Sequence, residues 1–367
     1  YFYQSNMDLF LLLGTGVYFC FVVIIFSGLL FRKKMIHPES NLPPVSVVVS
    51  ARNEEKNISN LLNDLVHQSI DKNHLEILIA NDRSDDSTGE IIDRFASEYS
   101  FIKTIHINKK HTMAPKKYAL TQAIDNSNGE IIIATDADCR VPRDWVKSMG
   151  LLVQNTGKIV IGYSKIDSGN TLINEFQKID FLGIMAANGG LLTHGIVCSG
   201  SGQNLAYKKE DFYKINGFEP VKDQTSGDDM YMVQTISSLK GAIFNYDPDS
   251  FVSTFPKKSI TGYLNQRIRW SSNSKSTLRS NPLFFGFLLS AFLANCCILY
   301  SIILPSSLSI FLITIKFFLE AFVIFIGSRL FLTSVSITAY IIWNLAQPIY
   351  IPIVGISGLI GKYSWKE

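Results

Sequence analysis

The chain has 367 residues, of which 47% are hydrophobic and 18% are charged, and its formal net charge at pH 7 is +3. So small a net charge argues against a nucleic-acid partner, because the Lys and Arg clusters flank apolar stretches instead of forming a basic face. The five cysteines have no paired spacing, which argues against a zinc site or a disulfide framework and fits a reducing compartment.

The first predicted element is a membrane-spanning helix. Residues 9–31 are apolar and uncharged, which is enough for the ~20 residues that cross a bilayer. Arg32, Lys33 and Lys34 follow directly, and this positive flank predicts that the next domain is cytoplasmic. Since no small-residue cleavage site follows, we expect an anchor at 7–34 and not a removed signal peptide. Residues 1–6 are interpreted as a remnant of an added segment.

Strands and helices then alternate along the chain. The apolar or β-branched segments 45–50, 75–80, 102–107 and 130–135 predict strands, and the amphipathic segments 58–66, 87–99 and 116–126 predict helices. This order predicts an α/β fold with a mainly parallel sheet, whose ligands bind beyond the carboxyl ends of the strands. Because no G-x-G-x-x-G follows the first strand and no P-loop lysine motif is present, a dinucleotide fold is set aside.

Polar residues follow these strands, with Arg52 and Glu54 after the first, Asp82 after the second and Asp136 after the fourth. If the chain stays extended through Ala137, the carboxylates of Asp136 and Asp138 point to one side. Hard oxygen ligands of this kind suit Mg²⁺ or Mn²⁺, with a substrate diphosphate completing the shell. The alternative is a solvated loop with two acids, and the position at a strand end favours the metal site.

A second acidic pair, Asp228-Asp229, precedes the helical stretch 230–239. Asp229 is the candidate general base, which would remove a proton from an acceptor hydroxyl, and Asp228 would orient its neighbours. Acids in a first helical turn also simply favour the helix dipole, which is the alternative interpretation.

The run QRIRW spans residues 266–270. On a helix Gln266, Arg269 and Trp270 share a face, while Arg267 is expected to point elsewhere. An amide and an arginine can hold the oxygens of a leaving diphosphate, and the indole can stack on an acceptor sugar. The alternative is an amphipathic helix at a membrane interface, and the two interpretations are compatible.

Two segments between these motifs allow two interpretations each. Gly200, Gly202 and Asn204 would let a ligand approach the backbone closely, or they form a tight turn that leads into a strand. Residues 174–185 predict a helix that belongs either to the core or to the membrane surface.

The last third of the chain is again apolar, with candidate spans at 284–304, 308–326 and 337–360 within a membrane region at 281–367. Pro348 and Pro352 predict a broken or re-entrant last helix. Lys316 and Glu320 are spaced i, i+4 inside a span, where they either neutralise each other or line a groove for a lipid headgroup or a growing sugar. Lys362 and Lys366 leave the side of the C-terminal tail open.

Taken together, these motifs resemble a membrane-bound glycosyltransferase family 2 enzyme with a GT-A-type domain, of the processive-synthase or ceramide-glucosyltransferase kind. The similarity covers roughly residues 44–278. SARNEE resembles the PxYNE-type segment, ANDRSDDST the VDDGSTD segment, PKKYAL the GKAxAL run, Asp136-Ala-Asp138 the D-x-D and QRIRW the QxxRW motif. Asn81, Arg83 and Asp228 depart from the family pattern, which bears on the nucleobase more than on the reaction.

The resemblance implies an inverting, single-displacement transfer from a nucleotide diphospho-sugar, with UDP as the expected nucleotide. It assigns nucleotide or donor contacts to Arg52, Glu54, Asp82, Lys116, Asp136, Gln266, Arg269 and Trp270, metal binding to Asp136 and Asp138, and the base to Asp229. A solvated helix start is the alternative for Lys116. We expect a hexosyltransferase at residues 35–280 that faces the cytoplasm at the inner cell membrane, with a lipid or lipid-linked acceptor and a possible oligomer. A processive polysaccharide synthase and a non-catalytic nucleotide-sugar-binding assembly subunit are the alternatives.

Overall fold

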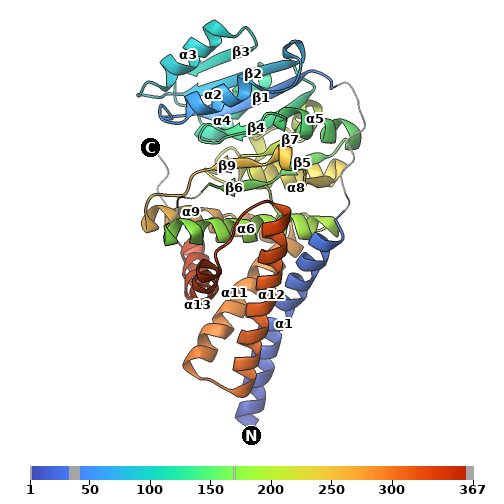
Figure 1. Ribbon diagram of the computed structural model, residues 1–367, viewed down its shortest axis with the longest axis vertical. Coiled ribbons are helices and arrows are strands. Elements are labelled where there is room, and N and C mark those ends of the chain that lie inside the picture. Colours follow the sequence, from blue (N-terminus) through green and yellow to red (C-terminus); the bar gives the residue numbers. More distant parts are fainter. Residues whose placement is uncertain (1, 33–41, 168, 170, 361–367) are drawn as a thin grey trace. The chain divides into compact units, whose positions relative to one another are not determined.

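The computed structural model describes residues 2–32, 42–167, 169 and 171–360, and it divides into two compact units (Figure 1). The first, here the sheet unit, comprises Lys33–Asp167 and Ser199–Phe255. The second, here the helical unit, comprises Tyr1–Arg32, Ser168–Cys198 and Pro256–Glu367. Residues 168–198 and 256–280 therefore group with the apolar helices, whereas a linear division of the chain at 35 and 280 would put them in the soluble domain.

The sheet unit contains a seven-stranded sheet in the order β3-β2-β1-β4-β7-β5-β8. Its strands are β1 (Val45–Ala51), β2 (Leu75–Asp82), β3 (Ile102–Ile107), β4 (Ile131–Asp136), β5 (Ile159–Gly162), β7 (Leu205–Lys208) and β8 (Ala242–Asn245). Strands β1 to β4 are parallel to one another, whereas β7 is antiparallel to both β4 and β5. A second, two-stranded sheet pairs β6 (Ser164–Ile166) with β9 (Val252–Thr254). The expected mixed, mainly parallel sheet is confirmed.

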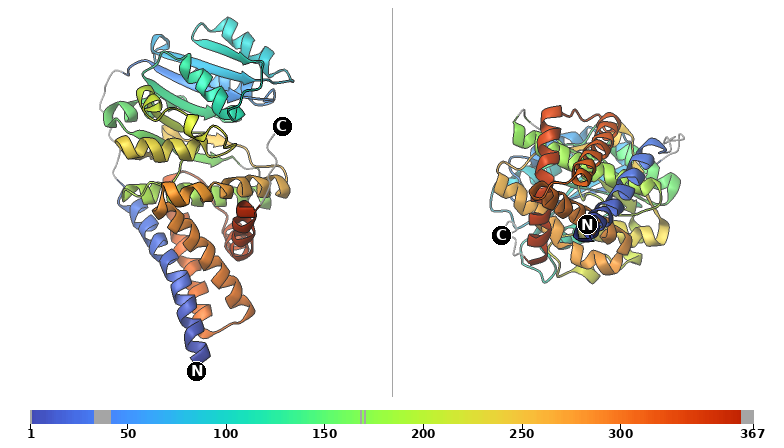
Figure 2. Two further views of the ribbon diagram at one scale, coloured as in Figure 1. Left: turned by 180° about the vertical axis from the view of Figure 1, so that it is seen from behind. Right: turned by 90° about the horizontal axis from the view of Figure 1, so that it is seen from below.

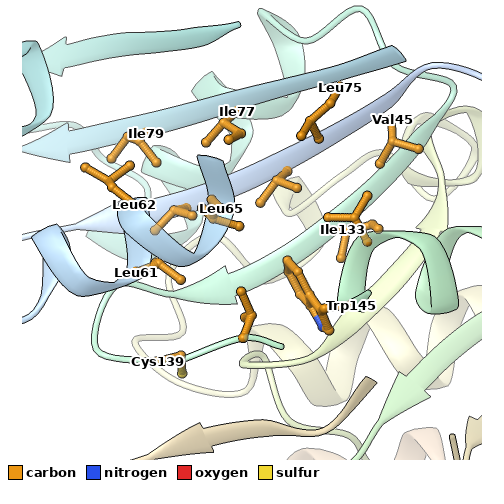
Figure 3. Packing of buried hydrophobic residues seen from close by; sticks show 14 of the residues in the cluster. Val45, Leu61, Leu62, Leu65, Leu75, Ile77, Ile79, Ile133, Cys139 and Trp145 are labelled. Atoms are coloured by element: carbon orange, nitrogen blue, oxygen red, sulfur yellow. The ribbon is translucent and has the colours of Figure 1, made fainter. Parts of the chain in front are cut away.

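Helices pack on the sheet through the apolar faces that the sequence predicts. The predicted helices correspond to α2 (Ile58–Val66), α3 (Thr88–Glu98) and α4 (Pro115–Asp125), and α5 (Trp145–Thr156), α7 (Lys209–Lys214) and α8 (Asp228–Lys240) complete the unit. Figure 3 shows Leu61, Leu62 and Leu65 of α2 facing the core side chains of the strands. Strand β1 is buried on both faces along nearly its whole length. This explains why its residues are mostly β-branched and do not alternate between apolar and polar side chains.

The order 3-2-1-4 places a topological switch between β1 and β4, since the chain leaves β1 on one side and returns on the other. The two strands end together, with Ser50 opposite Asp136. Ligands of open α/β sheets bind in the crevice at such a point. The fold thus directs attention to the segments that follow Ala51 and Asp136.

Among its described residues, the helical unit contains four helices that are long and apolar enough to cross a membrane. These candidate spans are Asp8–Leu30 within α1 (Phe2–Leu30), and α11 (Pro282–Ile303), α12 (Ser307–Leu330) and α13 (Ile337–Ile360). Figures 1 and 2 show α1, α11 and α12 running side by side. The one N-terminal and three C-terminal apolar helices are those that the sequence predicts.

The remaining helices of this unit are α6 (Leu172–Thr193), α9 (Ile260–Ser272) and α10 (Ser274–Ser280). Helix α6 extends beyond the predicted 174–185 and packs against α1, α12 and α13 of the same unit. At its crossing with α1 a Cβ added to Gly28 would lie 1.9 Å from the backbone oxygen of Gly190. Glycine is therefore required at this crossing, as small residues are wherever two helix backbones touch.

The expected break in the last apolar helix is wrong, because α13 is continuous through Pro348 and Pro352. Each proline removes one backbone hydrogen bond, but neighbouring helices can hold such a helix together. Here Pro348 and Pro352 are themselves buried. The tail with Lys362 and Lys366, and the flanking Lys33 and Lys34, lie outside the described residues.

Lys316 and Glu320 form a buried pair within α12, with Nζ 2.9 Å from Glu320 Oε1. The carboxylate also accepts hydrogen bonds from Tyr18 at 2.6 Å, Asn344 at 2.7 Å and Gln347 at 2.9 Å. Lys316 in turn donates to the side-chain oxygen of Gln347 at 3.1 Å. This network supports the interpretation as a mutually neutralising pair, and it joins α1, α12 and α13.

We expect Lys316→Leu to destabilise the protein by about 3 kcal/mol, because removing one partner of a buried pair leaves a buried, uncompensated charge. Activity per folded molecule should stay the same, since the pair neutralises itself. Replacing both residues with leucine should recover most of the loss. Unfolding in detergent measures all three variants, and a double variant less stable than the single one would contradict the interpretation.

Candidate functional site

The loops after β1 and β2 are joined by hydrogen bonds at the switch point. The backbone N–H of Glu54 donates to Thr88 Oγ1 at 2.7 Å, and the N–H of Asp85 donates to Asn53 Oδ1 at 3.0 Å. Two further bonds join Glu55 N–H to Asp86 and Ser87 N–H to Glu55. The loops that carry Arg52, Glu54 and Asp82 therefore form one preorganised edge.

Two of the predicted nucleotide contacts are already engaged within this edge. Asp82 binds Arg83 with both oxygens, at 2.7 Å to Nε and 3.0 Å to Nη2. Glu54 accepts a hydrogen bond from Asn57 at 2.8 Å. Arg83 has a φ of 53°, a left-handed conformation that suits the glycine of the resembled motif better than an arginine. Arg83 thus belongs to the candidate site. The only indication in the sequence was that an arginine stands where the resembled motif has a glycine.

The first acidic motif lies at the end of β4. Asp136 and Asp138 are both half-buried and Ala137 between them is buried. The chain does not stay extended here, because β4 ends at Asp136 and the backbone turns at Ala137 and Asp138, with the N–H of Cys139 donating to the carbonyl of Asp136 at 3.1 Å. Lys116 of α4 donates to Asp136 Oδ1 at 2.8 Å, and its Nζ lies 3.3 Å from Asp228 Oδ2. One lysine therefore joins acids from two distant segments, so the alternative of a solvated helix start does not describe Lys116.

The second acidic pair lies at the start of α8, directly after Gly227. Burial and the neighbouring carboxylate of Asp228 raise the pKa of Asp229 to about 6. Burial alone would raise the pKa of Asp228 as well, but the cations of Lys116 and Lys117 lower it below its usual value. Two adjacent carboxyls with pKa values pushed apart are the arrangement from which acid–base roles arise. The titrating group near neutrality is Asp229.

Gly202 faces this pair from the loop before β7. Its N–H donates to Asp229 Oδ2 at 3.1 Å, and a Cβ added there would lie 3.3 Å from Lys116 Nζ. Asn204, two residues on, is instead a core amide that accepts from Trp145 Nε1 at 2.9 Å and donates to the carbonyls of Tyr163 and Ser250. Gly202 thus lies beside the acidic pair, whereas the side chain of Asn204 fixes the start of β7 by hydrogen bonds in the core.

Lys117 is a residue that the sequence analysis does not single out. It is buried, and its ammonium donates to the backbone carbonyls of Gln224 and Ser226, just before the acidic pair. Lys117 therefore fixes the segment that leads to Asp228. Two adjacent lysines at the start of the predicted helix could have indicated this role, because Lys116 and Lys117 cannot lie on the same helix face.

Helix α9 of the helical unit carries the QRIRW run, with Gln266, Arg269 and Trp270 half-buried. The expectation that Arg267 points away from Trp270 is wrong. The side chain of Arg267 is only 3% exposed, and its guanidinium carbon lies 4.2 Å from the centroid of the Trp270 ring. Residues i and i+3 are neighbours on a helix, so Trp270 borders both the face of Gln266 and the face of Arg267.

Residues 46–215 match the family model described as Glycosyl transferase family 2. This part of the chain is a glycosyltransferase family 2 domain. The predictions of the family and of the enzyme class are confirmed at the level of this domain.

Relatives with curated names agree with the family. The probable glycosyltransferase YdaM of Bacillus subtilis is 27% identical over 64% of this chain, and the match covers 56% of that protein. A beta-monoglucosyldiacylglycerol synthase of Trichormus variabilis is 34% identical over 32% of this chain and 24% of its own. A poly-beta-1,6-N-acetyl-D-glucosamine synthase of Staphylococcus epidermidis is 23% identical over 76% of this chain and 65% of its own. Each match covers less than two thirds of the relative.

A solved structure has a fold similar to that of this chain. The mannosyltransferase PcManGT from Pyrobaculum calidifontis, in complex with GDP-Man and Mn²⁺, superposes with a TM-score of 0.66. The similarity covers 96% of this chain and 99% of that one, at 19% sequence identity. At this identity the comparison supports the fold of the chain and leaves its substrates to other evidence.

The oxygen ligands that Asp136 and Asp138 supply fit a hard divalent cation in part. Among the described residues no group of three or more His, Cys, Asp and Glu side chains could hold a metal. Asp136 and Asp138 alone supply fewer oxygens than the six that Mg²⁺ takes. Lys116 already neutralises Asp136, so a cation there would share that carboxylate. The two aspartates thus suit a cation whose remaining ligands come from diphosphate and water.

If Asp229 acts as a base, we expect kcat/KM of the protein to fall about tenfold per pH unit below pH 6 and to level off above it. A base with a raised pKa of about 6 is protonated, and so inactive, on the acid side of that value. Initial rates at saturating metal between pH 4.5 and 8 test this. A rate that stays constant down to pH 4.5 would exclude Asp229 as the titrating base.

Proposed function

We propose that the protein transfers a sugar from a nucleotide diphospho-sugar, with UDP the expected nucleotide, to a lipid or lipid-linked acceptor at a membrane. The observation that carries the proposal is the charged cluster at the switch point of a glycosyltransferase family 2 domain. There Lys116 joins Asp136 to Asp228, and Asp229 has a pKa near neutrality. Simple binding would not need a base of this kind beside a donor site.

Asp229 is the base in the proposed reaction. Its carboxylate takes the proton of the acceptor hydroxyl while that oxygen attacks the anomeric carbon, and the bond to the diphosphate breaks on the opposite face. The Gly202 N–H holds one oxygen of Asp229 in place at 3.1 Å. Asp228 stays ionised beside Lys116, so its negative charge keeps the neighbouring acid basic enough to act near pH 7.

Cationic groups are proposed to stabilise the negative charge of the leaving diphosphate. Lys116 is the first candidate, because burial would lower its pKa but Asp136 and Asp228 hold it well above the usual range. Arg269 and Gln266 of α9 are proposed to bind diphosphate oxygens, and Trp270 is proposed to face the acceptor. A Mg²⁺ or Mn²⁺ ion held by Asp136 and Asp138 would neutralise the diphosphate further when bound. Arg52, Glu54 and Asp82 are proposed to contact the nucleoside from the joined loops.

The acceptor is inferred from the membrane helices. Four helices of the chain are long and apolar enough to span a bilayer, and a domain tethered in this way meets lipids as its natural hydroxyl-bearing partners. One relative is named for the synthesis of a glycosylated diacylglycerol. We propose a cytoplasm-facing domain at the inner cell membrane, because the Arg and Lys residues after the first span predict that side.

Nucleotide-sugar binding is the first test. We would measure the melting temperature of the purified protein in detergent with a panel of nucleotide sugars, each with and without Mn²⁺. A ligand at a hundred times its Kd stabilises the folded state by about 2.7 kcal/mol, which such a scan detects. A panel with no stabilising nucleotide sugar would remove the proposal.

Product analysis separates the proposal from its alternatives. With the stabilising donor and a membrane lipid extract, mass spectrometry should find a lipid that carries one added sugar. A long polymer would instead indicate a processive synthase, which the polysaccharide-synthase relative makes a specific second candidate. Binding without either transfer or donor hydrolysis would indicate an assembly subunit.

A further inference from the structure

The buried face of α9 holds an ion pair for which the proposed transfer has no use. Arg267 Nη2 lies 2.7 Å from Asp180 Oδ2 of α6, and both side chains are less than a tenth exposed. The guanidinium also lies over two rings of its own helix, 4.9 Å from the centroid of Tyr263 and 4.2 Å from that of Trp270. All these residues belong to the helical unit.

Asp180 is itself held by hydrogen bonds from two helices. It accepts from the Tyr263 hydroxyl of α9 at 2.8 Å, from Trp343 Nε1 of α13 at 3.1 Å and from the Tyr350 hydroxyl of α13 at 3.2 Å. A buried carboxylate with this many donors has a fixed position. It therefore gives Arg267 a fixed counter-charge.

Arg267 is placed by its ion pair and by ring contacts. Nη2 of its guanidinium lies 2.7 Å from Asp180 Oδ2. The planar group also lies over the rings of Tyr263 and Trp270, a contact that arginine makes better than lysine. The Trp270 indole has this cation on one side and the Phe181 ring, 5.9 Å away between centroids, as a second contact.

We propose that Arg267, with Asp180 as its fixed counter-charge, is a positioning residue that sets the orientation of the Trp270 indole. The inference rests on the proposed function only in that Trp270 faces the acceptor there. It extends the function of the QRIRW run to its second residue, which acts through the tryptophan and touches no substrate. Through Asp180 it also links the indole to the apolar helix α13.

The test uses the whole protein labelled with 5-fluorotryptophan, whose four tryptophans give separate ¹⁹F resonances. Trp270→Phe assigns the Trp270 signal. In Arg267→Lys, which keeps the charge and loses the planar stack, we expect the Trp270 signal to shift or broaden while that of Trp145 stays unchanged. Transfer to the acceptor should fall about tenfold, with donor KM within twofold of the original value.

The matched control is Glu175→Gln, which removes the ion pair with Lys178 on the same helix α6 and has no contact with Trp270 among those described. It should leave both the Trp270 signal and the transfer rate unchanged. The double variant Asp180→Asn/Arg267→Gln removes both charges together, so it covers the case in which a single change prevents folding. The double variant should also move the Trp270 signal.

An unchanged Trp270 signal in both Arg267→Lys and the double variant would overturn the inference. So would a Trp270 signal that moves equally in Glu175→Gln, because that would indicate a general loosening of α6. The ¹⁹F measurement requires no substrate, so it tests the inference independently of the proposed function. If the proposed function alone fails, the Trp270 signal still changes in Arg267→Lys as expected, but the unaltered protein transfers no sugar.

Discussion

Asp229→Asn is expected to lower kcat by about 10²- to 10⁴-fold, the usual contribution of one proton-transfer group. Asparagine keeps the oxygen that accepts the Gly202 N–H at 3.1 Å, so the loop before β7 should stay in place. The amide cannot take a proton near neutral pH, so the variant loses the general base while its local structure is kept. Because the change also removes one of two adjacent carboxylates, the melting temperature should stay the same or rise.

The measurement combines turnover with donor binding. Initial rates give kcat, and stabilisation by the donor reports whether the nucleotide-sugar site is intact. Asp223→Asn, an exposed acid of the segment before α8, makes the same chemical change outside the cluster and should keep full activity. Turnover by Asp229→Asn at the unaltered rate would mean that another group, or water, accepts the proton.

Lys116→Met should produce the second largest loss, about 10- to 100-fold in kcat/KM, the equivalent of one lost charged hydrogen bond. The lysine neutralises Asp136 and Asp228 and lowers the pKa of Asp229. Without it the pKa of Asp229 should rise above 6, so the acid limb of the pH profile should move to higher pH. The loss should therefore be larger at pH 6 than at pH 8.

The pH dependence distinguishes this electrostatic effect from a binding effect alone. If Lys116 only touched the donor diphosphate, the rate would fall equally at every pH and the acid limb would stay in place. Lys110→Met, an exposed lysine of the loop before α4, is the matched control and should change neither the rate nor the limb. An acid limb that moves to lower pH in Lys116→Met would contradict the assigned sign.

Local patterns were sufficient for the first four strands, for the helices between them and for the class of fold. The β-branched run 45–50 and the period of Ile58, Leu61 and Leu65 depend only on which faces are buried, and these faces are visible in the sequence. The same holds for the apolar helices, whose length against a bilayer is a count along the chain. The prediction of a broken α13 was wrong because it concerned packing, which is not visible in the local sequence. A helix tolerates Pro348 and Pro352 only when the surrounding residues support it.

The candidate site was predictable as a set of residue types but not as a set of contacts. The spacing of Asp136 and Asp138 and the adjacency of Asp228 and Asp229 indicated acids for metal and proton chemistry. No local pattern indicated that Lys116 would join the two groups, or that Arg83 would engage both oxygens of Asp82. Such pairs come from segments that meet only when the sheet forms, or from a backbone angle that the residue type does not favour.

The sequence by itself determined where the first four strands, the apolar helices and the acidic motifs lie, because burial periodicity and span length are properties of consecutive residues. Only the tertiary structure decided the protonation of Asp229, the role of Lys117 and the burial of Arg267 against Trp270. These depend on low-dielectric surroundings and on charges carried by distant segments, and a side chain acquires such surroundings only when the chain is folded.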